Sequence, residues 1–390
     1  MLRRFALLAI AAALLAVPAA EAQVPAPDHD PFYKAPRHLD EVRRGAILRS
    51  RPVDLTALGL PLPFRSWQLL YRTNDTHGEP VATVATVILP LDGMAGPRPL
   101  LSYQPAEDSL TRNCASSYEL RKGDNPELAA MALGLMRGWA VVVSDYEGPD
   151  SQWIASLMAA HGVLDGIRAA QRFRRLGLAG RRTPVGLWGY SGGGHATGWA
   201  TELAASYAPR LRIKGAAFGG APVDVEATAR HLDGGLFAGI ELAAAVGLSR
   251  AYPEMRVGAL LNEAGRAMFR EIGDQCIEQF AGGYPFAKLR QFTTVADPLA
   301  VPRVERVLDA NRLGARAPEI PIYMWHSIID ELNPIGPTDA LAATYCRRGV
   351  ALKYNRTLLG EHVGAVATEA PGAVQYLADR FAGRPAPSTC

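Results

Sequence analysis

One segment has residue types and spacing suited to nucleophilic catalysis. Residues 189–193 have the sequence Gly-Tyr-Ser-Gly-Gly, the G-x-S-x-G pattern of a serine on a sharp turn from a strand to a helix. A serine hydroxyl is a weak nucleophile and needs a neighbouring base and donors for the developing oxyanion. The glycines relieve crowding where backbone segments approach closely, and the N–H of Gly192 is placed to face an oxyanion. We interpret Ser191 as a nucleophile; the alternative is a glycine-rich turn that only packs.

A serine in such a turn needs an acid and a histidine later in the chain, in that order. Histidines follow it at positions 195, 231, 326 and 362. His195 lies along the same expected helix and cannot reach over the hydroxyl, so we interpret it as a packing residue. His362 follows the last clear strand, and Asp330 and Glu331 follow the strand before it. The order predicts Asp330 and His362 as partners of Ser191, with Glu331 open as the acid because adjacent carboxylates cannot be ranked from sequence.

The elements that must position these residues are apolar strands alternating with helices. Continuous apolar runs are typical of strands buried on both faces, as in parallel sheets; they occupy residues 100–103, 139–145, 185–189, 213–218, 320–325 and 351–357. Residues 163–176 have helical spacing, and residues 67–73 and 81–89 flank a turn and predict an antiparallel hairpin. This alternation predicts an α/β fold with a mostly parallel central sheet and helices on both sides. In such sheets the carboxyl ends of the strands carry the site.

Residues 221–313 interrupt this alternation. They contain no clear buried strand and are rich in Ala, Leu, Gly and Phe, as in GGLFAGIELAAAVGL. Roughly 90 residues is far longer than a typical connection of about 4–6 residues. We interpret them as an inserted helical subdomain; the alternative is an ordinary continuation of the helices of the sheet.

Composition excludes several classes of protein. The 390 residues are 48% hydrophobic and 20% charged, which is normal for a globular chain and too apolar for intrinsic disorder. Formal charges nearly cancel at +3 and no basic stripe is visible, so nucleic acid is not an expected partner. The four cysteines are too few for a disulfide scaffold, but their even number suits an oxidising compartment.

The N-terminus predicts export. Arg3 and Arg4 precede an unbroken apolar run over residues 5–17, and Ala20-Glu21-Ala22 places small residues where a signal peptidase cleaves. We expect residues 1–22 to be a signal peptide cleaved after Ala22, leaving 23–390 as the catalytic domain, secreted or periplasmic. The alternative, a membrane anchor, is disfavoured because the run is short for roughly 30 Å of hydrocarbon.

The assembled residues resemble the secretory lipases of the lipase-A type, a branch of the α/β hydrolases. The resemblance runs from about residue 40 to residue 381. It is carried by AEDS at 106–109, NCA at 113–115, SDYEGP at 144–149, GYSGGG at 189–194, GGAPV at 219–223, DGGLFAG at 233–239 and GEH at 360–362. Each motif is weak alone, but together and in this order they are specific.

The resemblance implies an α/β-hydrolase fold with the triad Ser191, Asp330 and His362. It also implies an oxyanion site formed by Gly192 and Asp108, the latter in the loop from which this fold draws its second donor. An alternative role for Asp108 is a loop carboxylate that caps a helix.

The resemblance further implies that residues 221–313 form a helical cap over an acyl-binding site. We expect Leu236, Phe237 and Ile240 to line that site. Four cysteines allow three pairings; the resemblance pairs Cys114 with Cys276, which leaves Cys346 and Cys390 for each other. This second pair departs from the better-known members of the family.

The expected function is therefore hydrolysis of carboxylic esters, acylglycerols first, through an acyl-enzyme and without a metal or other cofactor. The expected partners are the ester substrate and a lipid–water interface, with no transmembrane anchor. The alternatives are a short-chain carboxylesterase, a peptidase or amidase of the same fold, and a binding protein without activity. Acyl length, interfacial activation and oligomeric state are not predicted.

Overall fold

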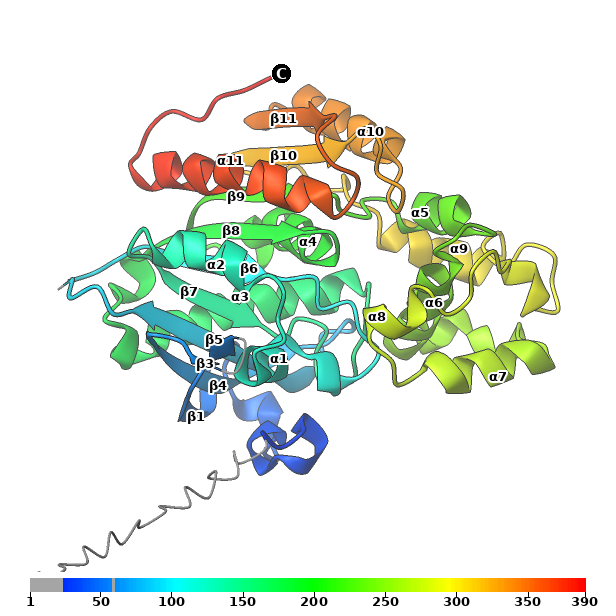
Figure 1. Cartoon of the computed structure of the whole chain (residues 1–390), viewed down its shortest axis with the longest axis horizontal. Coiled ribbons are helices and arrows are strands. Elements are labelled where there is room, and N and C mark those ends of the chain that lie inside the picture. Colours follow the sequence, from blue (N-terminus) through cyan, green and yellow to red (C-terminus); the bar gives the residue numbers. More distant parts are fainter. Residues whose placement is uncertain (1–23, 58–59, 95) are drawn as a thin grey trace, which may run out of the picture.

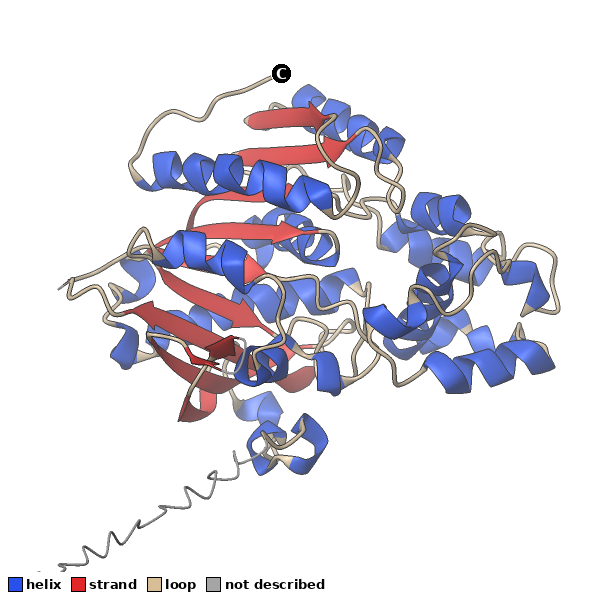
Figure 2. Ribbon diagram, in the orientation of Figure 1, coloured by secondary structure: helices blue, strands red, loops and turns tan. Residues whose placement is uncertain are grey.

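One nine-stranded sheet organises the molecule. The structure, a computed structural model, describes residues 24–57, 60–94 and 96–390, so the predicted signal peptide and its cleavage after Ala22 lie outside the described residues. The strand order is β1-β4-β5-β7-β6-β8-β9-β10-β11 (Figures 1 and 2). The strands are β1 (Ile47–Val53), β4 (Phe64–Asn74), β5 (Pro80–Pro90), β6 (Leu100–Gln104), β7 (Ala140–Ser144), β8 (Pro184–Tyr190), β9 (Arg212–Gly219), β10 (Ile322–Ser327) and β11 (Leu352–Thr357).

The sheet is mostly parallel, as predicted. From β7 to β11 every neighbouring pair in the sheet order is parallel, and β1, β4 and β5 add an antiparallel edge. The predicted hairpin is the β4–β5 pair, in which Thr73 faces Val81. The sequence pattern did not predict β1, because this edge strand of sequence ILRSRPV mixes exposed and half-buried residues without strict alternation and lacks a continuous apolar run. It also missed the small ribbon of β2 (Thr56–Ala57) and β3 (Leu60–Pro61).

Helices cover both faces of the sheet (Figure 2), and the alternating side chains of β8 illustrate the reason. In β8, Val185 and Leu187 pack into one core cluster, with α3, α4 and α10. Trp188 and Tyr190 pack into the other, with α2 and α11. Side chains of a strand alternate between faces, so a strand that is apolar at every position needs helices on both. The helices are α1 (Ser116–Lys122), α2 (Leu128–Leu135), α3 (Ser156–Arg172), α4 (Gly192–Tyr207), α10 (Ile335–Arg347) and α11 (Gly364–Phe381).

The segment between β9 and β10 consists of helices joined by turns and loops. Residues 221–313, all of them described, contain no strand, and they lie beyond the carboxyl ends of the parallel strands (Figure 1). Their helices are α5 (Val225–Leu232), α6 (Ala238–Ala251), α7 (Glu263–Ile272), α8 (Ile277–Phe280) and α9 (Pro302–Ala310). Most of them contribute to a separate apolar cluster that includes Leu242, Met268 and Leu308 together with Trp153 from outside the segment.

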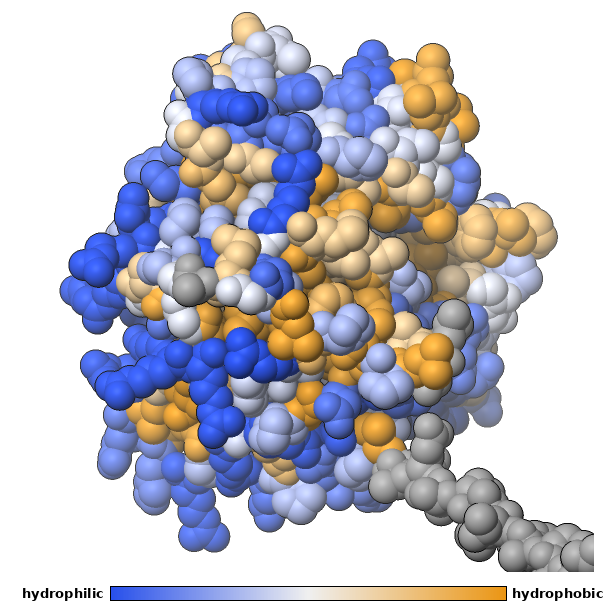
Figure 3. Space-filling model, turned by 60° about the vertical axis from the view of Figure 1, so that its left-hand side comes forward, coloured by the Kyte–Doolittle hydropathy of each residue, from blue (hydrophilic) through white to orange (hydrophobic). Residues whose placement is uncertain are grey.

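The surface carries scattered apolar patches. On the face in Figure 3, hydrophobic side chains form a band through the middle, with hydrophilic side chains at the left and lower edges. Within the described part of the chain, no helix has the length and apolar character needed to cross a membrane.

Close packing fixes the junction between β8 and α4. A Cβ added at Gly193 would lie 1.9 Å from the carbonyl oxygen of Gln104, at the end of β6. A Cβ at Gly189 would lie 2.2 Å from the carbonyl oxygen of Gly193. Both obstacles are backbone atoms, which cannot swing away as a flexible side chain does. Glycine at these two positions therefore lets α4 begin directly against the ends of β6 and β8.

We expect Gly193→Ala to lower the free energy of unfolding by roughly 3 kcal/mol or more, because the methyl group forces the backbone apart. The matched control is Gly336→Ala in α10, where a Cβ meets nothing within 4 Å. This control should be neutral or stabilising, because alanine is the better helix former. Urea unfolding of both variants makes the comparison, and an equal response would contradict the packing argument.

Candidate active site

Ser191 occupies the turn between β8 and α4. Its φ of 54° and ψ of −122° are unusual for a residue with a Cβ and are held by the packing around it. Its N–H donates to the carbonyl oxygen of Gly219, 3.0 Å away, at the end of β9. Strained backbone of this kind persists where the surroundings over-determine it, and it is frequent at functional sites. The hydroxyl therefore stands at the carboxyl edge of the parallel strands.

Three predicted residues form one chain of hydrogen bonds. His362 Nε2 lies 2.8 Å from Ser191 Oγ, and His362 Nδ1 lies 2.8 Å from Asp330 Oδ2. Glu331 is also close, but its carboxylate accepts the backbone N–H of His362 at 2.9 Å. The structure therefore places the side chain of Asp330, and not that of Glu331, against the imidazole ring. The arrangement can move a proton from the hydroxyl to a histidine whose other nitrogen is held by an acid.

The Asp330 carboxylate is fully buried yet well supplied with donors. One oxygen accepts the backbone N–H groups of Leu332 and Asn333, at 3.0 and 2.8 Å. Burial raises the pKa of Asp330, but hydrogen bonds from His362 and Asn333 outweigh it and hold the pKa below its ordinary value. His326 Nε2 lies 3.5 Å away and also contacts the carbonyl oxygen of Asn333 at 2.8 Å. Asp330 is thus kept ionised beside the imidazole.

Asp108 lies directly against the residue that follows the serine. A Cβ at Gly192 would sit 1.8 Å from Asp108 Oδ1, so a side chain there would displace the Asp108 carboxyl. The same oxygen accepts the indole N–H of Trp153 at 2.8 Å. Burial raises the pKa of Asp108 to about 6. Asp108 and Gly192 thus meet at the position expected for an oxyanion site.

A group of buried carboxyls supports the Asp108 loop from behind. Glu147 accepts both the N–H and the hydroxyl of Ser109, and Glu107 accepts the N–H of Tyr146 at 3.1 Å. Burial raises the pKa of Glu107 and of Glu147 well above the ordinary value, and in each case neighbouring carboxyls raise it further. The sequence reading did not single out these glutamates, although Glu107 and Glu147 lie in two of the motifs that carry the family resemblance.

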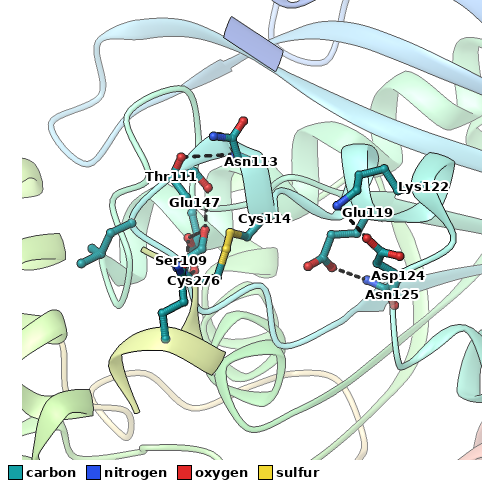
Figure 4. The surroundings of a disulfide bond; sticks show 12 residues. Ser109, Thr111, Asn113, Cys114, Glu119, Lys122, Asp124, Asn125, Glu147 and Cys276 are labelled. Atoms are coloured by element: carbon teal, nitrogen blue, oxygen red, sulfur yellow. Dashed lines mark hydrogen bonds and ion pairs between the residues drawn. A yellow bond between two sulfur atoms is a disulfide. The ribbon is translucent and has the colours of Figure 1, made fainter. Parts of the chain in front are cut away.

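A disulfide joins the Asp108 loop to the helical segment. Cys114 pairs with Cys276, at the start of α8, and Glu147 and Ser109 lie beside the bond (Figure 4). Ser109 also forms a β-bridge with Cys276, and the N–H of Leu110 donates to the carbonyl oxygen of Gln275 at 2.9 Å. Cys346 pairs with Cys390. Both predicted pairs are confirmed: the first is the one that the resemblance implied, and the second is the one that was left by elimination.

A cavity of about 60 Å³ opens beside Ser191 and is roofed by the helical segment. Ile240 lines it, as expected, whereas Leu236 is 54% exposed, Phe237 is partly buried, and neither lines it. These two residues precede α6 and so do not share its inner face. Other residues that line this cavity, and that the sequence did not predict, include Trp153, Ile154, Val225, Ala229, Ala244 and Ile277.

The remaining histidines lie elsewhere. His195 is buried, with Nε2 3.1 Å from Ser156 Oγ and Nδ1 3.2 Å from the carbonyl oxygen of Pro222. Burial lowers its pKa to about 4, so it packs as a neutral ring. His231 contacts the carbonyl oxygen of Glu331. Across the described ranges, no group of three or more His, Cys, Asp and Glu side chains is arranged to hold a metal ion.

Known proteins share this sequence and fold. A family model described as "Secretory lipase" matches residues 125–389. A probable inactive lipase of Mycobacterium tuberculosis is 38% identical over 92% of this chain and 83% of its own length. Lipase A of Arthroderma benhamiae is 35% identical over 93% and 81%. The crystal structure of Candida antarctica lipase A is 33% identical, with a TM-score of 0.87 over 93% of this chain and 88% of that one.

We expect Asp330→Asn to slow labelling of Ser191 by a fluorophosphonate roughly 10⁴-fold, because the amide favours the wrong imidazole tautomer. Glu331→Gln is the matched control and should stay within about tenfold, because its carboxylate contacts only the backbone of His362. Labelling rates followed by mass spectrometry make the comparison. The reverse ranking would assign the acid to Glu331.

Stability should fall as the pH rises above about 4.5, the ordinary pKa of a glutamate. The raised pKa values of Glu107 and Glu147 keep these carboxyls protonated in the folded state at pH values where the unfolded chain has released the protons. Each carboxyl that stays protonated should therefore cost roughly 1.4 kcal/mol of stability per pH unit. Urea unfolding at a series of pH values above about 5 measures this slope. Glu147→Gln should reduce it, while Glu305→Gln, at an exposed position of α9, should not; a flat profile in the unsubstituted protein would contradict the prediction.

Proposed function

Because the chain belongs to the secretory lipase family, we propose that it is an exported serine hydrolase that cleaves carboxylic esters, with acylglycerols as its substrates. The observation that carries this proposal is the continuous chain of hydrogen bonds from Ser191 through His362 to Asp330. It lies at the floor of an apolar cavity under a helical segment. A nucleophile, a base and an orienting acid within hydrogen-bond reach are what acyl transfer requires.

The reaction proceeds in two acyl transfers. Ser191 Oγ bonds to the acyl carbon while its proton passes to His362 Nε2, and Asp330 stabilises the imidazolium that forms. The ester C–O bond then breaks, and the alcohol leaves with that proton. Water then attacks the acyl carbon and gives a proton to His362; the bond from that carbon to Ser191 Oγ breaks, the acid is released, and His362 passes the proton from water to Ser191 Oγ.

Gly192 and Asp108 stabilise the oxyanion of both steps. The N–H of Gly192 lies in the first turn of α4, where helix N–H groups lack partners within the helix. Asp108 supplies the second donor, through its backbone or through its carboxyl when that is protonated. Each donor in such a site is worth roughly 3–4 kcal/mol of transition-state stabilisation.

Residues 221–313 act as the cap of this site. Their helices line the cavity beside Ser191, and the Cys114–Cys276 disulfide anchors the segment to the Asp108 loop. Exposed apolar side chains, suited to a lipid–water interface, flank the loops that carry Asp330 and His362. They are Ile328, Ile329, Leu358, Leu359 and Val363.

Export follows from the family and from the cysteines. The matching family model is of secretory lipases, and two disulfides are typical of proteins that mature in an oxidising compartment. Residues 1–22 are proposed as the signal peptide, removed after Ala22. Residues 23–390 then form one catalytic domain with the cap inserted in it.

The name of one relative supports a second candidate function. A lipase described as probable inactive is 38% identical to this chain, so a binding protein without catalysis is the alternative. The intact hydrogen-bond chain of Ser191, His362 and Asp330 favours activity.

We expect the protein to hydrolyse aryl esters across a chain-length series and an emulsified long-chain triglyceride. Ser191→Ala should reduce the rate about 10⁶-fold without changing the melting temperature. A variant that keeps a tenth of the activity would remove Ser191 from its role. Turnover of acetyl and butyryl esters alone would make the protein a short-chain esterase, turnover of aryl amides in preference would make it an amidase, and no turnover with no phosphonate labelling would favour the binding protein.

A further inference from the structure

A buried carboxyl inside the cap has another carboxyl as its hydrogen-bonding neighbour. Glu241, in the first turn of α6, is 4% exposed. Both of its oxygens are buried and accept no hydrogen bond from an N–H or hydroxyl group of the described residues, and its hydrogen-bonding neighbour is the carboxyl of Asp233. Buried polar groups are nearly always hydrogen-bonded, and two carboxyls can pair only by sharing a proton. The mechanism above gives Glu241 no role.

Glu241 lies where two cavities meet. The first is the cavity beside Ser191, and the second, of about 70 Å³, lies deeper in the cap. Four residues line both: Val225, Ala229, Glu241 and Ala244. An acyl chain that extended from Ser191 into the second cavity would therefore run along these four residues, Glu241 among them.

The rest of the deeper cavity is apolar. Its lining is otherwise aliphatic, aromatic or thioether apart from Thr293, whose hydroxyl donates to the carbonyl oxygens of Leu289 and Val295. Glu241 is its one ionisable residue. A plain hydrocarbon chain would leave that carboxyl unpaired, whereas a chain with an oxygen atom at this depth would pair with it.

Glu241 is a neutral acid under ordinary conditions. Burial, together with the charge of the neighbouring Asp233 and a hydrogen bond to it, raises its pKa to about 9. A protonated carboxyl can donate one hydrogen bond and accept another, which is the pairing that a hydroxyl group offers in return.

We propose that Glu241 is a binding subsite for a hydroxyl group on the acyl chain, so that esters of hydroxylated acids are the preferred substrates. The inference rests on the proposed ester hydrolysis and refines it by naming the acyl group. A site built to hydrogen-bond a substrate hydroxyl discriminates against the analogue that lacks it, because the protein group is then left unpaired.

Asp233 provides the competing explanation. A proton shared between Glu241 and Asp233 would give Glu241 a structural partner and no role toward substrate. Asp233 Oδ1 also accepts the N–H of Leu289 at 2.8 Å, and the carboxyl keeps acceptor sites for Glu241. The Asp233→Asn variant separates the two explanations.

The first test compares aryl esters of linear twelve-carbon acids, unsubstituted or with a hydroxyl moved one carbon at a time along the chain. We expect kcat/KM to be about tenfold or more higher for one hydroxyl position than for the plain chain. Glu241→Leu should abolish this preference and speed up the plain ester, Glu241→Gln should keep part of it, and Asp233→Asn should leave it unchanged. No preference in the unsubstituted enzyme, or one that survives Glu241→Leu, would overturn the inference.

The second test does not need catalysis. Thermal shifts of Ser191→Ala with the free acids should show stronger stabilisation by the preferred hydroxy acid than by the plain one, and Glu241→Leu on that background should equalise them. If no ester is hydrolysed but this binding preference holds, the proposed hydrolysis fails and the subsite stands. If esters are hydrolysed without either preference, the subsite fails and the hydrolysis stands. Glu241→Gln covers the case in which Glu241→Leu does not fold.

Discussion

The site depends on how closely the start of α4 packs against the ends of β6 and β8. Side chains at Gly189 and Gly193 would collide with backbone carbonyl oxygens, and one at Gly192 would collide with Asp108. Removing the Cβ at all three positions lets Ser191 take its strained backbone conformation and point its hydroxyl out of the sheet edge. The position of His362 and the approach of Asp108 both follow from that placement. A looser junction would keep the same sheet but separate Ser191 from His362.

Around this junction the protein buries several carboxyl groups, and an apolar interior cannot hold all of them in the ionised form. Asp330 is held ionised by its donors, while Glu107 and Glu147 are pushed toward the protonated state, because donors offset burial in the first case and neighbouring carboxyls add to it in the second. Residues of one chemical type thus have opposite charge states within one site. The difference lies in the hydrogen bonds that surround each group.

The helical segment is connected to the candidate site in two ways. Covalently, Cys276 fastens α8 to the loop that carries Asp108. By packing, α5 and α6 supply the walls of the cavity that begins at Ser191. The proposed cap thus contacts both the proposed oxyanion donors and the proposed acyl site. Glu241 places a carboxyl in the lining of the deeper cavity, which is otherwise apolar apart from Thr293.

The sequence by itself determined the parallel sheet, the turn that carries Ser191, the order of acid and histidine along the chain, and the helical insertion. Each of these depends on the local pattern and spacing of residue types. The sequence missed β1, whose exposed edge position hides its periodicity. It could not decide whether Asp330 or Glu331 contacts the imidazole, because the two carboxylates are adjacent in sequence. Only the fold places Asp330 at the ring and Glu331 at the backbone N–H of His362. The sequence placed Leu236 and Phe237 at the cavity, although only the fold decides which face of the cap turns inward. The buried carboxyls, Glu241 among them, also required tertiary structure, since burial and hydrogen-bond partners are properties of the surroundings and not of a residue's type.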